Sequence, residues 1–437
     1  MTEKSKSQEY LDEFSRYVIM DPYPFVIDIK KSKGMWLHTV DGANIFDWAG
    51  YYGSKLIGHN HEDMFEPDYI QTLIYAANNK VANPDFLTPE CVRYYRKLHE
   101  IAPECMRNDK LEIYVVNSGA EAIENMMKYF INLHDLKWQK SGNPSGIRRF
   151  IYFDKAFHGR TVFALNITRL PHAPNITKNF ELIYDANIKV PFPVILDKDS
   201  REVNLSSMQK SLEMVEEQLK RYGHEIVGII VEPIQGAGGH RMADPEFFRR
   251  LSKLAKEYDV YLGFDEVQTA GGQTGTFFAI DNLNLPYPPQ GLAAGKKLGN
   301  GVVYMLYPME DKGILDSTWG GSLTDMVRFC QEMKIVEREG LIDKVPHKAT
   351  LLVEGLSHLH QEYPNKIFNI RGMGLYQGFS VKGEANLNKL IQDALQKEQL
   401  LLLEAGTLSV RLRPVLDVTE SDIYLFIEKL DRCLREL

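Results

Sequence analysis

Residues 260–268, VYLGFDEVQ, run from a short apolar segment directly into an acidic pair. Residues 260–265 have the length and the aliphatic and aromatic composition of a buried β-strand. Asp265 would then lie at the carboxyl end of that strand, which is the edge where ligands bind in open α/β sheets. This segment therefore favours a parallel sheet with a ligand site at its edge, with a solvated acidic turn as the alternative.

Segments on both sides of this strand alternate short runs of β-branched and aromatic residues with longer amphipathic stretches. That alternation is typical of βα units around a largely parallel sheet, so we expect the α/β class. Strands are predicted at residues 111–116, 149–153, 226–232 and 292–295, and helices at residues 120–138, 245–258 and from 323 onward. Residues 169–204 contain several prolines and little periodicity, which predicts a long excursion on the surface or at a subunit contact.

The chain is long enough for two domains. Its 437 residues, of which 44% are hydrophobic and 25% charged, can bury a large core. Residues 367–437 mix short strands with helices, and we expect the first part of the chain to pack with them. The predicted boundaries are 1–63 for the N-terminal part of the small domain, 64–324 for the large domain and 325–437 for the C-terminal part of the small domain.

Composition argues against several classes of function. The formal net charge is −8, and no cluster of Lys and Arg is dense enough to predict binding to nucleic acid or to an anionic membrane. Residues 1–10 are polar and no apolar run is long enough to span a bilayer, so we expect a cytoplasmic protein. The four cysteines show neither metal-site spacing nor a disulfide framework, and we expect no metal site.

Residues 117–121, NSGAE, connect a predicted strand to a predicted helix. Ser118 and Glu121 have the spacing of a capping box, and Gly119 would let a ligand approach the backbone closely. The free N–H groups at such a helix start can hold a phosphate. Because capping boxes are common, an ordinary helix start is the alternative.

Residues 295–301, GKKLGNG, place two lysines at the end of another predicted strand. A lysine acts as a nucleophile only when burial or a neighbouring charge keeps its amine neutral, whereas most lysines are solvated surface charges.

Two glycine-rich runs fail as nucleotide motifs. Residues 291–296 have three rather than four residues between the glycines of a P-loop, and residues 236–241 end on Arg241 where a dinucleotide fingerprint needs a small residue.

Five segments match the blocks of one family in family order, and they are residues 117–122, 157–161, 231–236, 265–268 and 296–301. Together they resemble the class III (ω-amino acid) aminotransferases, a branch of the fold-type I enzymes that use pyridoxal 5'-phosphate (PLP). The resemblance spans nearly the whole chain. It implies a large domain with a mostly parallel seven-stranded sheet and a small α+β domain built from both termini. Within the family, the sequence of these segments is most similar to that of the lysine-specific group, which also lacks the arginine that most members have in place of Gln273.

The resemblance assigns a role to each matched position. Lys296, rather than Lys297, would form the Schiff base with PLP and carry protons, and Asp265 would pair with the pyridine nitrogen. Gln268 would bond the phenolic oxygen of PLP. The full cofactor-binding set is Ser118, Gly119, Ala120, Phe157, His158, Asp265, Gln268, Lys296 and Thr318. Thr318 would come from the neighbouring subunit, so the resemblance implies a homodimer with composite active sites.

Arg160 and Arg411 match the two family arginines that bind substrate carboxylates, with Gln268 beside them, whereas Arg413 looks like a neighbour. The implied reaction moves the terminal (ε) amine of L-lysine to 2-oxoglutarate. It gives L-glutamate and 2-aminoadipate 6-semialdehyde, which cyclises to piperideine carboxylate. The alternatives are another ω-amino acid aminotransferase (for ornithine, 4-aminobutyrate or a related diamine acid), an aminomutase of the same fold, and a PLP-fold binding protein without catalysis.

The sequence departs from the family at two positions. Ala237 stands where the family block Gln-Gly-Glu-Gly-Gly has glutamate, and Ser322 stands where the family usually has asparagine. In the family that glutamate pairs with the second arginine while the amino donor is bound. With Ala237, we expect Arg411 to stay free in both half-reactions, so that it also binds a donor's α-carboxylate and lets the α-amine react.

Overall fold

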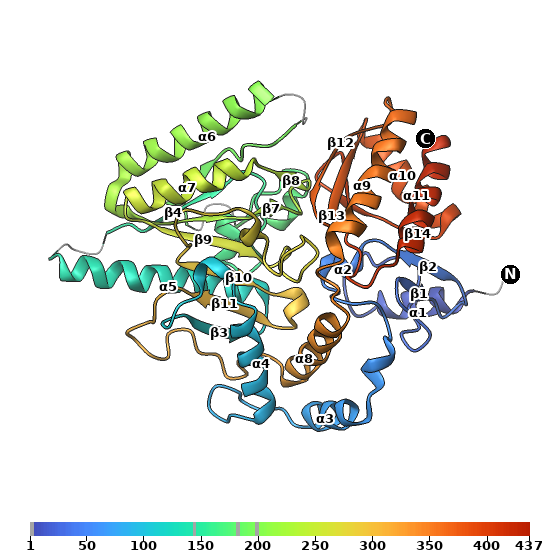
Figure 1. Ribbon diagram of the computed structural model, residues 1–437, viewed down its shortest axis with the longest axis horizontal. Helices are drawn as coiled ribbons and strands as arrows, with labels where there is room; N and C mark the ends of the chain where they lie inside the picture. Colours follow the sequence, from blue (N-terminus) through green and yellow to red (C-terminus); the bar gives the residue numbers. More distant parts are fainter. Residues whose placement is uncertain (1–3, 143–145, 181–183, 197–200) are drawn as a thin grey trace.

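A sheet of seven strands occupies the middle of the chain (Figure 1). The computed structural model describes residues 4–142, 146–180, 184–196 and 201–437. The strands, in spatial order, are β3 (Glu112–Val116), β11 (Gly301–Met305), β10 (Gly291–Ala294), β9 (Tyr261–Glu266), β6 (Ile226–Val231), β4 (Arg149–Phe153) and β5 (Ile188–Val190). Strand β11 runs antiparallel to both of its neighbours, and the other pairs are parallel. The predicted mostly parallel seven-stranded sheet is confirmed.

Helices cover both faces of this sheet, which explains why its central strands are apolar on both sides. The covering helices are α5 (Gly119–Lys140) on one face and α6 (Arg201–Tyr222) and α7 (Pro245–Glu257) on the other (Figure 1). Every residue of β6 is buried, and Ile229 packs on the α7 side while Ile230 packs on the α5 side. Gly263 of β9 makes room for α5, because an added Cβ would lie 2.9 Å from the Met126 side chain.

The strands and helices predicted from the sequence are found within about two residues of their predicted bounds, the usual uncertainty of helix and strand ends. Helix α8 (Leu323–Arg338) begins at the predicted residue. The prediction for residues 169–204 was wrong in part. This segment contains β5, which completes the sheet as an edge strand, and Phe192 just after it is 3% exposed. Three residues are too few to show a strand period in the sequence.

A smaller antiparallel sheet lies beside the large one (Figure 1). Its strands are β12 (Ile367–Met373), β13 (Tyr376–Val381), β16 (Ser409–Arg411) and β15 (Leu403–Ala405), and its helices are α9 (Val345–Glu362), α10 (Glu384–Glu398) and α11 (Glu420–Arg435). A third sheet joins β1 (Trp36–His38) and β2 (Asn44–Asp47) to β14 (Leu400–Leu401), which pairs in parallel with β2. Segments from the two ends of the chain therefore share a sheet, while the predicted boundaries at 63/64 and 324/325 stay predictions.

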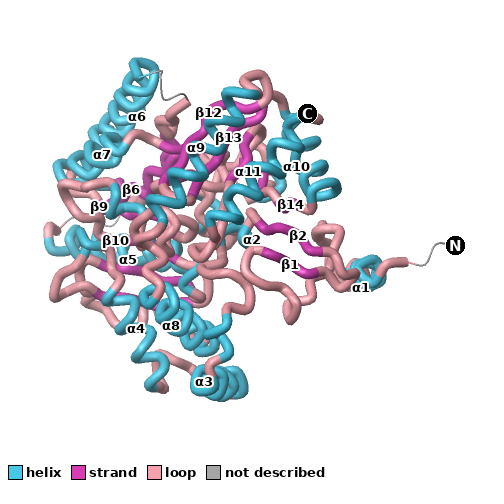
Figure 2. Tube along the Cα trace, turned by 45° about the vertical axis from the view of Figure 1, so that its right-hand side comes forward, coloured by secondary structure: helices cyan, strands magenta, loops and turns pink. Residues whose placement is uncertain are grey.

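The remaining α-helices and strands lie outside these three sheets. They are α1 (Lys6–Phe14), α2 (Gly50–Gly53), α3 (Pro67–Asn78), α4 (Pro89–Glu100), β7 (Ile234–Gln235) and β8 (Arg241–Met242). Helices α3 and α4 both pack on α8, and the three gather at one end of the molecule in Figures 1 and 2. In the chain, α8 follows β11 of the large sheet and precedes α9, which packs on β12 of the smaller sheet.

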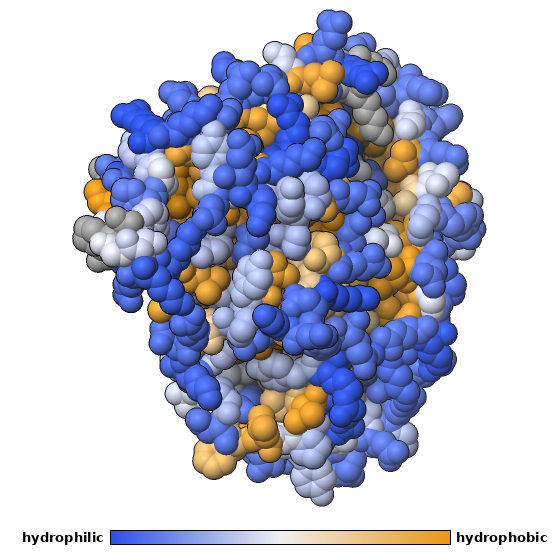
Figure 3. Space-filling view, turned by 60° about the vertical axis from the view of Figure 1, so that its left-hand side comes forward, coloured by the Kyte–Doolittle hydropathy of each residue, from blue (hydrophilic) through white to orange (hydrophobic). Residues whose placement is uncertain are grey.

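The surface is of mixed polarity, and on the face drawn in Figure 3 hydrophilic residues surround small hydrophobic patches. Among the described residues, no helix combines the length and the apolar composition needed to cross a membrane. All four cysteines are free thiols.

Candidate active site

The carboxyl ends of β6, β9 and β10 open into a cavity of about 310 Å³. Strands β9 and β10 are parallel, with Ala294 opposite Glu266, so Lys296 emerges beside the end of β9. Of the residues predicted from the sequence, the cavity is lined by Gly119, Ala120, Phe157, His158, Arg160, Asp265, Gln268 and Lys296. Positions scattered over the whole middle of the chain therefore meet at one sheet edge, as the topology of open α/β sheets requires.

The side chains of the adjacent Lys296 and Lys297 point in different directions. The Lys296 amine lies at the cavity and donates a hydrogen bond to the backbone oxygen of Tyr52 at 2.8 Å. Lys297 is 3% exposed and donates to the backbone oxygens of Gln268 (2.6 Å) and Ala270 (2.9 Å). Lys297 thus donates to buried carbonyls and does not line the 310 Å³ cavity, whereas Lys296 does line it.

The surroundings of Lys296 favour a neutral amine. Burial, together with the charges of Arg411 and Arg413, lowers the pKa of Lys296 to about 7. A lysine with such a pKa can both take up and release a proton near neutral pH. Lys296 (φ 51°) and Tyr52 (φ 60°), which it contacts, both have left-handed backbones that side chains other than glycine's rarely adopt. Strain of this kind concentrates at functional sites.

Asp265 is held in the floor of the cavity by a buried histidine. Its Oδ2 accepts a hydrogen bond from Nδ1 of His158 at 2.7 Å, and its Oδ1 accepts one from the backbone N–H of Val267 at 2.9 Å. Burial lowers the pKa of His158, but the hydrogen bond and charge of Asp265 outweigh this and raise it above its ordinary value. Nε2 of His158 is buried without a hydrogen-bond partner among the described residues. The contact with Asp265 therefore favours proton uptake by His158.

A second carboxyl, Glu232, lines the same cavity and was not predicted as a site residue. Its Oε1 accepts a hydrogen bond from the backbone N–H of Phe157 at 3.0 Å. Burial raises the pKa of Glu232 to about 8, which the His158 charge opposes and the Asp265 charge reinforces. The signal that could have found it is the one that found Asp265, because Glu232 also follows a buried strand at its carboxyl end.

The start of α5 forms a backbone cradle at one end of the cavity. Ser118 is the N-cap, and its Oγ accepts from the N–H of Glu121 at 3.2 Å. The Glu121 carboxylate accepts from the N–H of Asn117 instead of that of Ser118, so the predicted capping box forms only in part. A Cβ added to Gly119 would lie 2.5 Å from the Val267 side chain. Glycine thus brings the first N–H groups of the helix, which have no partner within it, up to the cavity wall.

A second cavity of about 580 Å³ adjoins the first, and both are lined by Phe157, Arg160, Gln268 and Lys296. Arg411 of β16 lies in the larger cavity, and its Nε is buried without a hydrogen-bond partner among the described residues. Ala237 lines the same cavity and supplies no carboxylate to Arg411. The side chains of Arg160 and Arg411 therefore line the same cavity as Lys296.

Two of the predicted cofactor-binding residues, Ser118 and Thr318, line neither cavity, and Thr318 is not part of the cradle at the start of α5. Thr318 is exposed. Nearby Ser322 has a structural role as the N-cap of α8, where its Oγ accepts from the N–H of Asp325 at 3.4 Å and its own N–H donates to Asn300 at 2.7 Å.

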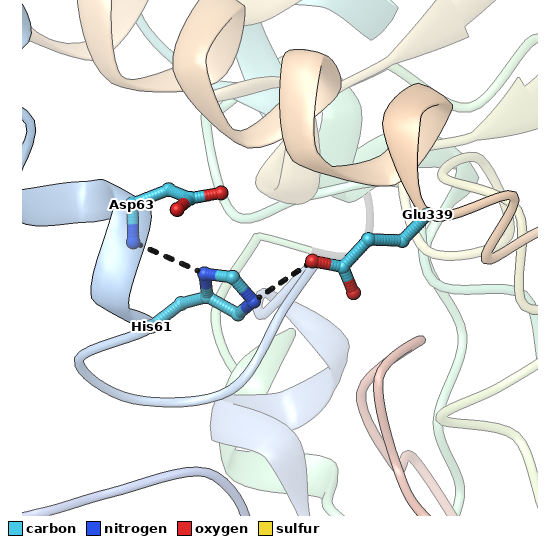
Figure 4. Close-up of side chains that lie close together, drawn as sticks. All are labelled: His61, Asp63 and Glu339. Carbon is cyan, nitrogen blue, oxygen red and sulfur yellow. Dashed lines mark hydrogen bonds and ion pairs between the residues drawn. The ribbon is translucent and has the colours of Figure 1, made fainter.

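A group of side chains away from the cavities has ligand types that metals use. Figure 4 shows His61 between Asp63 and Glu339, with its Nε2 3.2 Å from the Glu339 carboxylate and its Nδ1 accepting from the N–H of Asp63 at 3.3 Å. Arg338 forms ion pairs with both carboxylates. Since the guanidinium already balances their charge, we interpret the group as an ion-pair cluster, and the expectation of no metal site stays a prediction.

The residues present at the 310 Å³ cavity fit PLP. A lysine amine with a lowered pKa, a carboxylate on the neighbouring strand β9 and a cradle of helix N–H groups are what its aldehyde, pyridine nitrogen and phosphate require. The unpartnered His158 Nε2 and the close contact of Gly119 with Val267 mark a polar, shaped pocket instead of packed core. These features define a PLP-dependent enzyme.

Comparison with known proteins gives the family. The class III aminotransferase family model matches residues 19–434. The chain is 29% identical to L-lysine-epsilon aminotransferase of Amycolatopsis lactamdurans over 95% of this chain and 93% of that protein. It is 31% identical to acetylornithine aminotransferase of Prochlorococcus marinus over 74% and 73%. The solved structure of lysine aminotransferase from M. tuberculosis matches with a TM-score of 0.93, 27% identity and coverage of 99% and 100%.

The chain belongs to the class III aminotransferases. Its cofactor is PLP, and its substrates are an amino acid and a 2-oxo acid. The predictions of fold type, family, enzyme class and cofactor are thereby confirmed.

Proposed function

We propose that this aminotransferase transfers the terminal amino group of L-lysine to 2-oxoglutarate, yielding L-glutamate and 2-aminoadipate 6-semialdehyde. The observation that carries the proposal is the 580 Å³ cavity, which Arg160, Arg411 and Lys296 line together. A substrate with a carboxylate at one end and a reacting amine at the other suits this arrangement. Similarity to lysine aminotransferases over nearly the whole chain supports the choice of lysine.

Each group of PLP has a protein partner in the proposal. The N–H groups at Ser118, Gly119 and Ala120 hold the phosphate, and Phe157 covers the ring. Asp265, held in place by its hydrogen bond with His158, pairs with the pyridine nitrogen and holds a proton there. When bound, PLP supplies an aldehyde that takes up amines and a ring that accepts electrons from the substrate carbon.

Lys296 and the two arginines perform the remaining steps. With a pKa of about 7, the Lys296 amine can take a proton from the reacting carbon of the substrate and deliver it to the bound cofactor. Arg160 and Arg411 bind substrate carboxylates in a bidentate manner, which fixes the reacting carbon near that amine. The dicarboxylic acceptor can use both arginines at once.

The proposed assembly is a homodimer in which Thr318 of each chain completes the phosphate site of the other. Thr318 is exposed and lies outside the cavities of its own chain, which supports this assignment. Large apolar side chains elsewhere on the surface, such as Phe86 and Leu87, are about 70% exposed. Sedimentation should show a dimer, and Thr318→Ala should weaken PLP binding; a monomer that retains PLP at full affinity would contradict the assignment.

The test of the reaction is an absorbance scan of the PLP-loaded protein, with Lys296→Ala as control. Addition of L-lysine should remove the visible band of the bound cofactor, and 2-oxoglutarate should restore it. A band that does not respond to lysine but responds to acetylornithine, ornithine or 4-aminobutyrate would establish the second candidate, another ω-amino acid aminotransferase. The similarity to acetylornithine aminotransferase is the observation that favours that alternative.

A further inference from the structure

Behind Gln268, on the side away from Lys296, lies an aromatic residue with no assigned role. Tyr376 of β13 has no exposed surface, and its hydroxyl lies 2.6 Å from the side-chain amide of Gln268. Gly236 lies against the same end of the amide, because an added Cβ would lie 2.1 Å from the Gln268 side-chain oxygen. The amide is therefore confined, and the main freedom left to it is a reversal of its oxygen and nitrogen.

Tyr376 is itself held by a buried cation. The guanidinium of Arg413, which is 2% exposed, lies over the Tyr376 ring with its Cζ 3.4 Å from the ring centroid. Arg413 donates to the backbone oxygen of Leu412 at 2.8 Å and to Nδ1 of His240 at 3.1 Å. None of the described carboxylates forms an ion pair with it. Because a buried charge without an anion is unfavourable, the face of the tyrosine ring is its main electrostatic partner.

The hydroxyl of Tyr376 is suited to donate. Burial raises the pKa of Tyr376, while the charges of Arg413 and Arg411 act in the opposite direction, so the phenol keeps its proton at neutral pH. A cation against the ring also polarises the O–H bond and makes it a better donor. With Tyr376 donating to Oε1 of Gln268, the amide nitrogen faces the cavity as a donor.

The reversed amide has its own partners. In that orientation Nε2 of Gln268 donates to the Tyr376 hydroxyl at 2.6 Å, and Oε1 accepts from Lys296 and from Arg411, each at 3.3 Å. Two cations thus favour an oxygen facing the cavity, whereas the tyrosine proton favours a nitrogen there. The orientation of Gln268 is set by the balance between these two sides.

We propose that Tyr376, backed by Arg413, is a positioning residue that turns the amide nitrogen of Gln268 toward the ring oxygen of bound PLP. The inference rests on the proposed contact between Gln268 and that oxygen. Tyr376 touches neither substrate nor cofactor and acts through Gln268 alone. Its contribution is to supply the one buried donor that the correctly oriented amide needs at its oxygen.

The test replaces the hydroxyl and follows the bound cofactor without any substrate. A hydrogen bond to the ring oxygen stabilises the form with more negative charge on that oxygen, which prevails at high pH. Tyr376→Phe should therefore raise the pH midpoint of the visible band by roughly one unit, the change expected from losing one charge-assisted hydrogen bond. Tyr304→Phe is the matched control, because Tyr304 is equally buried and donates to the backbone oxygen of Leu98 at 2.9 Å.

A double-variant cycle separates positioning from a general effect on packing. If Tyr376 acts through Gln268, then Tyr376→Phe should leave the midpoint unchanged when added to Gln268→Ala. Additive shifts in the two variants, or a midpoint in Tyr376→Phe equal to that of Tyr304→Phe, would overturn the proposal. Because no amino donor is used, failure here is distinct from failure of the lysine reaction, which is read from the response of the wild-type band to L-lysine.

Discussion

The substitution Ala237→Glu tests how the active site chooses between the two amines of lysine. Ala237 lines the 580 Å³ cavity together with Arg411, whose Nε is buried without a hydrogen-bond partner among the described residues. A free guanidinium at this place can bind the α-carboxylate of a donor and bring the α-amine to the cofactor. A carboxylate at position 237 should occupy Arg411 while the donor is bound, and should leave the ω-amine as the group that reacts.

The expected magnitude follows from one added hydrogen bond. A hydrogen bond to a charged group contributes about 1.5–3 kcal/mol, and the lower end applies because the new carboxylate must itself lose water. About 1.4 kcal/mol corresponds to a tenfold change in an equilibrium. We therefore expect the ratio of ω-transfer to α-transfer to rise about tenfold in Ala237→Glu.

The assay uses L-lysine labelled with ¹⁵N at the terminal amine and measures the label in the glutamate product by mass spectrometry. Transfer of the ω-amine places ¹⁵N in glutamate, whereas transfer of the α-amine does not. Ala237→Gln is the control, because it adds similar volume without the charge and should leave the ratio near that of the wild type. An unchanged labelled fraction in Ala237→Glu would refute the view that a free Arg411 governs the choice.

Three further predictions concern the cofactor site. The free energy of unfolding of the cofactor-free protein should rise from about pH 7 to pH 10. The reason is that the unfolded chain binds the Lys296 proton up to its ordinary pKa of 10.5, whereas the folded chain releases it near 7. Denaturant titrations at several pH values should show a smaller rise in Lys296→Ala. Asp265→Asn should lower kcat by about 10²- to 10⁴-fold in steady-state assays, with the pKa of His158 falling by NMR. Gly119→Ala should weaken PLP binding in equilibrium dialysis, because the new methyl group meets Val267.

The sequence predicted that the site lies at the carboxyl ends of the strands. Asp265 and Lys296 could be found because each follows an apolar strand, and the ends of parallel strands meet at one edge. Glu232 has the same local signal, but it lies within a block matched to the family and was not predicted as a site residue. The choice between Lys296 and Lys297 needed the family resemblance, since neighbouring residues share almost the same sequence context. Only the structure shows that one of them donates to buried carbonyls.

Other features had no local signal in the sequence. Strand β5 is three residues long, so it shows no periodicity, and its place depends on pairing with β4. The stack of Arg413 on Tyr376 and the bond from Tyr376 to Gln268 join residues far apart in the chain. The sequence predicts Arg413 to be a neighbour of the substrate arginine rather than a ligand, and only its contacts show that it is a buried cation over an aromatic ring. Contacts of this kind arise from tertiary packing, which pattern alone does not specify.

The charges around Lys296 also couple substrate binding to catalysis. Arg411 is one of the cations that hold the pKa of Lys296 near 7, and in the proposed function it is also a ligand of the substrate carboxylate. When a carboxylate pairs with Arg411, the positive field at Lys296 weakens, and its amine binds a proton more strongly. Since Lys296 would be bonded to PLP while the site waits, this change acts on the amine that is set free when a substrate binds, and it makes that amine a stronger base. A substrate that leaves Arg411 unpaired gains less from this change, so Arg411 contributes to selectivity in proton transfer as well as in binding.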